Sequence, residues 1–172
     1  MAVGQPLGQP PSCNRLIENA MAYTTAEGRE QILDDLAVAI EQIADALACL
    51  GEAYEQLDEQ QADALEDRLF RPVQAAYGRA QRTHAEFAAR SGLHGRSFEA
   101  HSPGAQSQTV RALIERAADA AHDADQSIAE LQDSMLPVEV GDAELRAGLS
   151  QVREMLAAVP TRARNLVRTV GR

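Results

Sequence analysis

Apolar residues recur at alternating steps of three and four along most of this chain, which is the pattern of helices that pack against one another. The first stripe comprises Leu33, Leu36, Ile40, Ile43, Leu47, Leu50, Tyr54 and Leu57. The second comprises Val110, Ile114, Ala117, Ala121, Ala124, Ile128, Leu131 and Met135, and the third comprises Leu145, Leu149, Val152, Leu156, Val159, Ala163, Leu166 and Val170. A fourth set is expected inward at Leu65, Leu69, Val73, Ala76, Ala80, Thr83 and Phe87. The pattern predicts an all-α protein.

Capping residues and turn formers divide the chain into segments. We expect a flexible tail at 1–11, because three prolines and two glycines oppose a helix there, followed by one helical domain at 12–172. Ser12 and Thr25 are candidate N-caps. The predicted helices span about 12–22, 26–57, 62–90, 106–135 and 142–171. Four long helices and one short N-terminal helix predict an up-and-down four-helix bundle.

Two boundaries have alternatives. Asp58 with Gln61, or Asp63 with Glu66, could form a capping box, which places a turn near 58–62. The rival interpretation is one helix that continues to Arg71 and breaks at Pro72; otherwise Pro72 kinks the second long helix. Near the C-terminus, the apolar stripe stays in phase across Pro160, which predicts a kink or a brief break.

A long loop is predicted between the second and third long helices. Ser91 to Ser107 contains three glycines, a proline, four serines and two histidines, a composition that opposes regular structure. Loops carry binding residues more often than helices do. His94, Arg96, Phe98 and His101 are therefore candidate partner-binding residues, although a merely tolerated insertion explains the loop equally well.

Composition narrows the class of protein. The net charge is −10, all basic residues are arginine and tryptophan is absent, which argues against general nucleic-acid binding. Cys13 and Cys49 match no metal-binding or redox spacing and are expected to be free thiols. No apolar run reaches the length of a membrane span and no signal peptide is evident, so we expect a cytoplasmic protein without a cofactor.

Metal chemistry requires carboxylates that converge, and the heptad register places the acids on outer faces. Glu115, Asp119, His122 and Asp123 share neighbouring turns, but that register assigns them to a solvated helix face. The remaining metal hypothesis combines two acidic runs on different helices, as in helical nucleotide pyrophosphatases. Those runs are Glu52 with Glu55 and Glu130 with Asp133. The hydrolase hypothesis requires these four carboxylates to meet around a cleft.

Charge alternates in blocks along the chain. Residues 1–67, 68–116, 117–145 and 146–172 carry net charges of −12, +5, −8 and +5. Much of this pattern is expected to pair within the bundle. The C-terminal block is the exception, because Arg162, Arg164 and Arg168 follow Pro160 with no acid among them and could meet an acidic partner.

These observations favour a non-enzymatic interaction or scaffolding protein that packs a helix face against a protein partner or a second copy of itself. The long loop or the basic C-terminus would supply specificity. Two alternatives remain: the metal-dependent hydrolase that uses outward carboxylates, and an amphipathic protein that binds an anionic surface.

Overall fold

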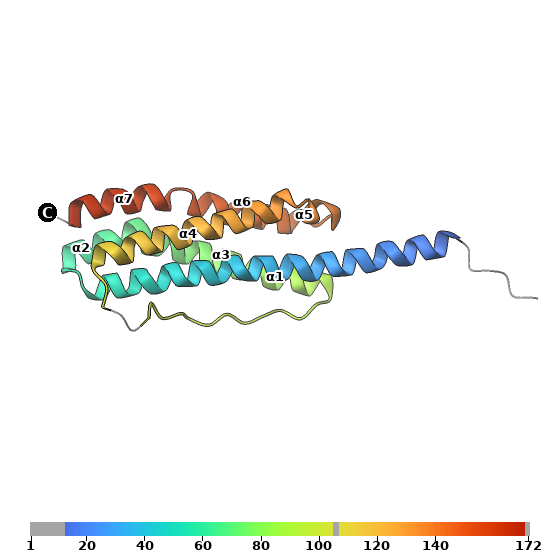
Figure 1. Ribbon diagram of the computed structural model, residues 1–172, viewed down its shortest axis with the longest axis horizontal. Coiled ribbons are helices and arrows are strands. Elements are labelled where there is room, and N and C mark those ends of the chain that lie inside the picture. Colours follow the sequence, from blue (N-terminus) through green and yellow to red (C-terminus); the bar gives the residue numbers. More distant parts are fainter. Residues whose placement is uncertain (1–12, 105–106, 171–172) are drawn as a thin grey trace, which may run out of the picture.

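Helices lie side by side along one long axis in the computed structural model (Figure 1). The structure describes residues 13–104 and 107–170, and for residues 13–24 it describes the backbone alone. All the elements within this part of the chain are helical. The predicted flexible tail at 1–11 lies outside the described residues.

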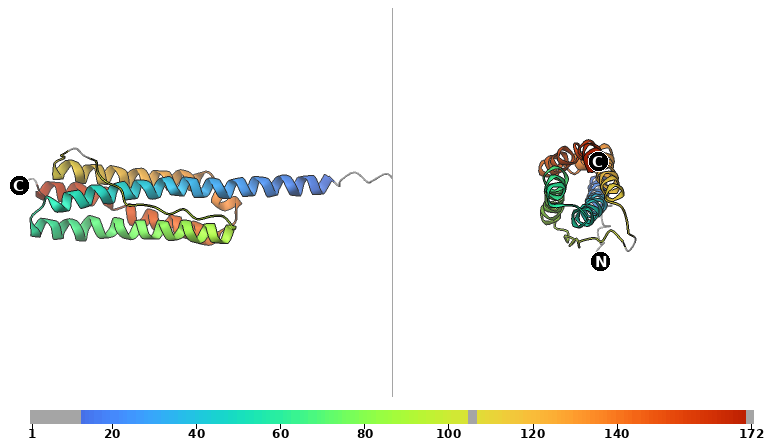
Figure 2. Two further views of the ribbon diagram at one scale, coloured as in Figure 1. Left: turned by 90° about the horizontal axis from the view of Figure 1, so that it is seen from below. Right: turned by 90° about the vertical axis from the view of Figure 1, so that its left-hand side faces the viewer.

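The first helix, α1 (Cys13–Glu55), is continuous, so the two separate helices predicted at 12–22 and 26–57 are wrong. No proline lies near Thr25, an isolated glycine such as Gly28 is tolerated inside a helix, and a capping residue alone does not stop a helix that is already formed. Gly28 is the first residue of α1 described as buried, and the side chain of Leu136 packs beside it. The N-terminal part of α1 extends beyond the other helices (Figures 1 and 2).

A tight turn at 56–58 follows α1, a few residues before the predicted position. Asp58 is the N-cap of α2 (Glu59–Leu65), and its carboxylate accepts a hydrogen bond from the Gln61 amide at 2.9 Å. The rival interpretation, one helix continuing to Arg71, is therefore wrong. The predicted second helix, at 62–90, begins three residues earlier, at Glu59, because Asp58 caps it.

Pro72 does not end the second helical segment. A π-helical turn, η1 (Glu66–Phe70), stands between α2 and α3 (Arg71–Ser91), directly before Pro72. Proline has no amide hydrogen and its ring crowds the carbonyl four residues earlier, so a widened turn accommodates it. The inward set predicted for this segment, from Leu65 to Phe87, is buried at all seven positions.

Residues 92–104 and 107–109, which we call the strap, contain no helix or strand, as expected for the predicted long loop. Gly92 ends α3 with φ 68°, a left-handed conformation that glycine adopts without strain. The strap returns along the outside of α1 to the opposite end of the molecule (Figures 1 and 2). Consequently α3 and α4 run in the same direction, which differs from the predicted up-and-down order, where consecutive long helices alternate.

The third long helix, α4 (Val110–Asp133), is shorter than the predicted span of 106–135 because Thr109 caps it. Met135 then adopts a left-handed conformation and starts the single turn α5 (Leu136–Glu139), so its predicted inward position is wrong. The last predicted helix divides into α6 (Ala143–Leu156), capped by Asp142, and α7 (Val159–Val170), which has Pro160 in its first turn. The brief break predicted near Pro160 is confirmed.

The core lies between these helices. α1 packs most extensively against α4 and also against α3, while α6 packs against α3 and α7 against α4. Figure 2 shows this square arrangement in end view. Stripe residues such as Leu36, Ile114 and Leu149 are fully buried, whereas Tyr54 is 37% exposed near the end of α1. Pockets border the strap and lie between α4 and α7.

Candidate functional site

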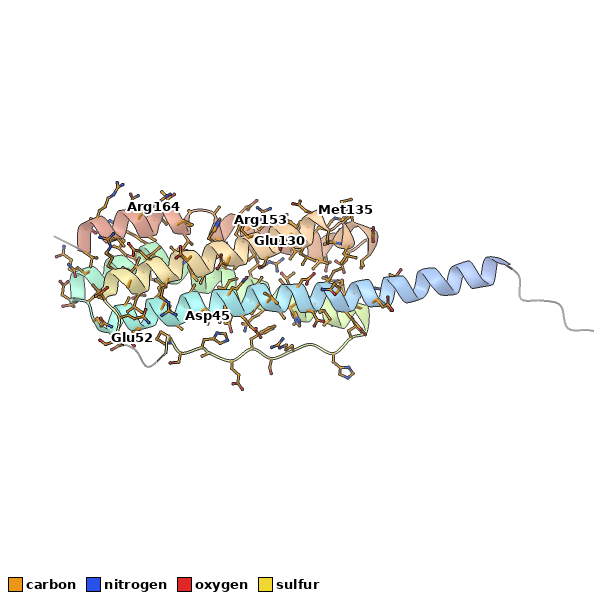
Figure 3. All side chains as sticks on the ribbon, in the orientation of Figure 1. Asp45, Glu52, Glu130, Met135, Arg153 and Arg164 are labelled. Atoms are coloured by element: carbon orange, nitrogen blue, oxygen red, sulfur yellow. The ribbon has the colours of Figure 1, made fainter. Side chains whose placement is uncertain are left out.

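The four carboxylates of the hydrolase hypothesis do not converge. Glu52 lies near the C-terminal end of α1, whereas Glu130 lies near the opposite end of the bundle, on α4 (Figure 3). Glu55 and Asp133 are three residues beyond them on the same helices. Among the described residues, no group of three or more His, Cys, Asp or Glu side chains is placed to hold a metal ion. The cleft that this hypothesis requires is not formed.

Two other sets singled out by the sequence do meet. A groove of about 540 Å³ runs between α4 and α7, with Glu115, Asp119 and His122 on its α4 side and Arg164 and Arg168 on its α7 side. Helical spacing of three and four places each set on one face of its helix. The metal-like constellation of α4 is thus opposite guanidinium groups rather than further ligands.

The floor of this groove is apolar. It is formed by small or medium side chains of both helices: Ala118, Pro160, Ala163 and Val167. Ala163 is buried, and the other three are half-buried. Pro160 and Ala163 lie in the first two turns of α7, so the break before this helix sets the position of the floor.

The charges around the groove are unequally neutralised. Arg111 pairs with Glu115 at 2.9 Å within α4, an exposed pair that contributes little to stability. Arg164 donates a hydrogen bond only to the Thr161 hydroxyl, at 3.2 Å, among its described contacts. No ion pair within the described residues involves Arg164, Arg168 or Asp119. Within the described residues, the α7 side therefore presents positive charge without an ion-pair partner.

Arginines elsewhere do pair within the molecule, as the charge blocks predict. Arg153 of α6 donates to Asp125 of α4 at 2.8 Å. Arg90 of α3 donates to both carboxylate oxygens of Asp142 at 2.9 and 3.0 Å. Asp142 also caps α6, and the pKa of its carboxyl is lowered, chiefly by the hydrogen bond from Arg90. These pairs join helices, whereas Arg164 and Arg168 of α7 take part in no ion pair among the described residues.

The strap residues predicted as a binding set lie against α1 and α3. Arg96 forms an ion pair with Glu41 of α1, and His101 Nδ1 lies 2.6 Å from a carboxylate oxygen of Asp45. The side chain of Phe98 is half-buried between these two contacts. His94 is exposed in the N-terminal half of the strap. All four residues therefore border one surface, although only Phe98 inserts into it.

His84 of α3 lies under the strap and is 2% exposed. Its ring meets that of Phe98 edge to face, with centroids 5.2 Å apart and an angle of 87° between the rings. No hydrogen-bond partner for its Nδ1 atom is found among the described residues. Burial, followed by the nearby Arg96 guanidinium, lowers the pKa of the imidazole. The burial of His84 depends on the strap, whose path follows no periodic pattern in the sequence.

Two further predictions concern cysteine and membrane spans. Cys49 is a free, buried thiol, and burial raises its pKa, so it stays protonated at neutral pH. The side chain of Cys13 lies outside the described residues. In the part of the chain that the structure describes, none of the helices combines the length and apolar character needed to cross a bilayer.

Known proteins provide no assignment for either surface. Comparison of the chain with protein-family models, with curated proteins and with solved structures finds no match.

Proposed function

We propose that this chain is a non-enzymatic interaction protein that binds an amphipathic helix of a protein partner in the α4–α7 groove. The observation that carries the proposal is the combination of an apolar floor with two guanidinium groups on one side that form no ion pair with any described residue. Helix-in-groove recognition uses apolar anchors spaced by three, four and seven residues, with charges along the flanks. Ala118 and Ala163 are small enough to admit such anchors.

Charge specifies the orientation of the partner. Arg164 and Arg168 are separated by four residues, so they lie on one face of α7 and can meet acids spaced in the same way. Asp119 on the α4 side favours a basic or neutral flank there. The proposed partner is therefore a helix with an apolar stripe whose acidic flank faces α7. Such complementarity raises the association rate and rejects partners of the wrong sign.

The test uses two synthetic fluorescent helical peptides that share one leucine stripe. One carries glutamates along a flank, and its twin carries lysines at the same positions. Fluorescence anisotropy with the full chain is expected to show that the acidic peptide binds about tenfold more tightly, a preference that weakens as salt rises. Equal affinity for both peptides would contradict the proposal.

Variants identify the surface. Arg164→Gln with Arg168→Gln is expected to remove the preference for the acidic peptide. Arg162→Gln is the matched control, because Arg162 is exposed on the same helix but does not line the groove. Ala118→Phe fills the floor and is expected to weaken binding of both peptides. A preference that survives the double substitution would place recognition elsewhere.

The anionic-surface alternative is distinguished in the same experiment. Vesicles of phosphatidylserine and phosphatidylcholine replace the peptides. Binding to vesicles without selective binding of the acidic peptide would overturn the proposal in favour of the alternative. Selective peptide binding without vesicle binding supports the proposal. Light scattering of the full chain separately reports whether the chain forms a dimer. If Ala118→Phe abolishes a dimer, the occupant of the groove is a second copy of this chain and not a partner protein.

A further inference from the structure

The contact between the strap and the bundle centres on a buried imidazole. His84 is enclosed by α1, by its own helix α3 and by the strap, and Phe98 of the strap rests against its ring. A cavity of about 340 Å³ borders this contact. Its titratable lining comprises Glu30 and Asp34 of α1, His84 of α3, and His94 and Arg96 of the strap.

The surroundings favour the neutral imidazole. Nδ1 finds no acceptor or donor within the described residues, so a proton there would be buried without a partner. Arg96 adds repulsion, while Asp34 and a backbone hydrogen bond with Leu33 act in the opposite direction. Burial and the guanidinium together outweigh them, and the pKa of His84 is lowered.

Movement of the strap can remove the free-energy cost of burying a protonated His84. It has no helix or strand of its own between Gly92 and Thr109 in its described residues. Arg96 and Phe98, the two groups that respectively repel and cover the imidazole, both belong to it. Moving this half of the strap away would hydrate His84 and remove Arg96 in one step.

We propose that the strap is a pH-sensitive cover whose N-terminal half separates from α1 and α3 when His84 is protonated. The C-terminal half stays attached through the contact of His101 Nδ1 with a carboxylate oxygen of Asp45, at 2.6 Å. Release uncovers the surface between α1 and α3 that Phe98 closes at neutral pH. This inference concerns a surface other than the α4–α7 groove and does not depend on the proposed function.

The test is ¹⁹F NMR of the full chain labelled with 4-fluorophenylalanine. The chain has three phenylalanines, of which Phe87 is buried in the core and Phe98 reports on the strap. Between about pH 8 and about pH 5, the Phe98 signal is expected to move to the position of a solvated ring. The Phe87 signal is expected to stay unchanged, which shows that the bundle remains folded.

Two matched variants make the result decisive. His84→Gln removes the titrating group and is expected to keep the packed Phe98 signal at about pH 5. His94→Gln, which changes an exposed histidine of the same cavity, is expected to open as the unmodified chain does. Should His84→Gln alter the Phe87 signal at neutral pH, His84→Asn serves as the second neutral variant. The proposal is overturned if Phe98 stays packed at low pH, if it opens equally without His84, or if Phe87 changes together with it.

Discussion

Met135 adopts φ 66° and is the one non-glycine residue with positive φ among those described. Its side chain is 51% exposed, so packing does not compensate the strain. A left-handed backbone costs an L-residue about 1–2 kcal/mol, because Cβ approaches the following carbonyl. The turn between α4 and α5 therefore uses an unfavourable residue at a position suited to glycine.

Met135→Gly is expected to raise the free energy of unfolding by about 1 kcal/mol, since relief of strain exceeds the added entropy of the unfolded chain. Urea denaturation measures the change. Met135→Ala is the control, because it removes the side chain but keeps Cβ and hence the strain. A gain of equal size in the alanine variant would show that the side chain, not the backbone, is the source.

Asp142 combines two roles, as the N-cap of α6 and as the acceptor for Arg90. Because its pKa is lowered in the folded state, the charged form stabilises the fold at neutral pH. That contribution is present above the carboxyl pKa of the unfolded chain, about 4, and is lost as pH falls through the lower folded pKa.

Asp142→Asn keeps a capping oxygen but removes the charge, so we expect a loss of about 1 kcal/mol at neutral pH. The difference from the unmodified chain should shrink below about pH 4. Denaturation over a pH series tests this. Glu144→Gln is the matched control, because Glu144 also pairs with Arg90 but its side chain is 75% exposed. A difference that stays constant in acid, or an equal loss in the control, would contradict the explanation.

At the scale of elements, α3 and α6 approach closely where Gly148 faces Thr83. A Cβ atom on Gly148 would lie 2.4 Å from the Thr83 hydroxyl oxygen and 2.7 Å from its methyl carbon. Glycine normally weakens a helix by about 1 kcal/mol relative to alanine. Here the absence of a side chain permits the contact between helices.

Gly148→Ala is expected to destabilise the chain by about 2 kcal/mol, because the clash exceeds the gain in helix propensity. Adding Thr83→Ala removes both clashing atoms and should restore most of the loss. Gly51→Ala is the control, since a Cβ atom at Gly51 would have no atom within 4 Å and the change should be neutral or stabilising. Thermal or urea unfolding of these variants beside the unmodified chain checks the cycle, and a Gly148→Ala protein as stable as the unmodified chain would contradict it.

Helix positions and the inward faces could be predicted from periodicity, because burial repeats with the helical turn. The inward set from Leu65 to Phe87 and most of the stripe on α4 are buried as expected. The continuity of α1 past Thr25 was not predicted, because a residue that can cap a helix can equally lie inside one. Tyr54 and Met135 were predicted to face inward but are exposed, and both lie near helix ends, Tyr54 at the end of α1 and Met135 as the residue before α5.

The sequence predicted which site residues share a helix face, but not which two faces lie opposite each other. Periodicity placed Asp119 and His122 on one face of α4, and sequence charge singled out Arg164 and Arg168. Only the packing of α7 on α4 brings these faces together. His84 shows the same limit, because its burial depends on the path of the strap, which follows no periodic pattern.

In the whole molecule, the strap is the connection that decides which helices are neighbours. The strap lets α3 and α4 run in the same direction, so the neighbours of α4 are α1 on one side and α6 with α7 on the other. This arrangement places the arginines of α7 beside the acids of α4 and forms the proposed partner groove. Arg164 lies on the outer surface of that helix (Figure 3).

The most direct test of the proposed recognition is a reversal of charge. Arg164→Glu with Arg168→Glu gives the α7 side of the groove negative charge while the apolar floor is unchanged. Anisotropy titrations with the two peptides should then show the preference inverted, with the lysine peptide bound more tightly than the glutamate peptide. Preference for the glutamate peptide that persists in this variant would contradict recognition by the α4–α7 groove.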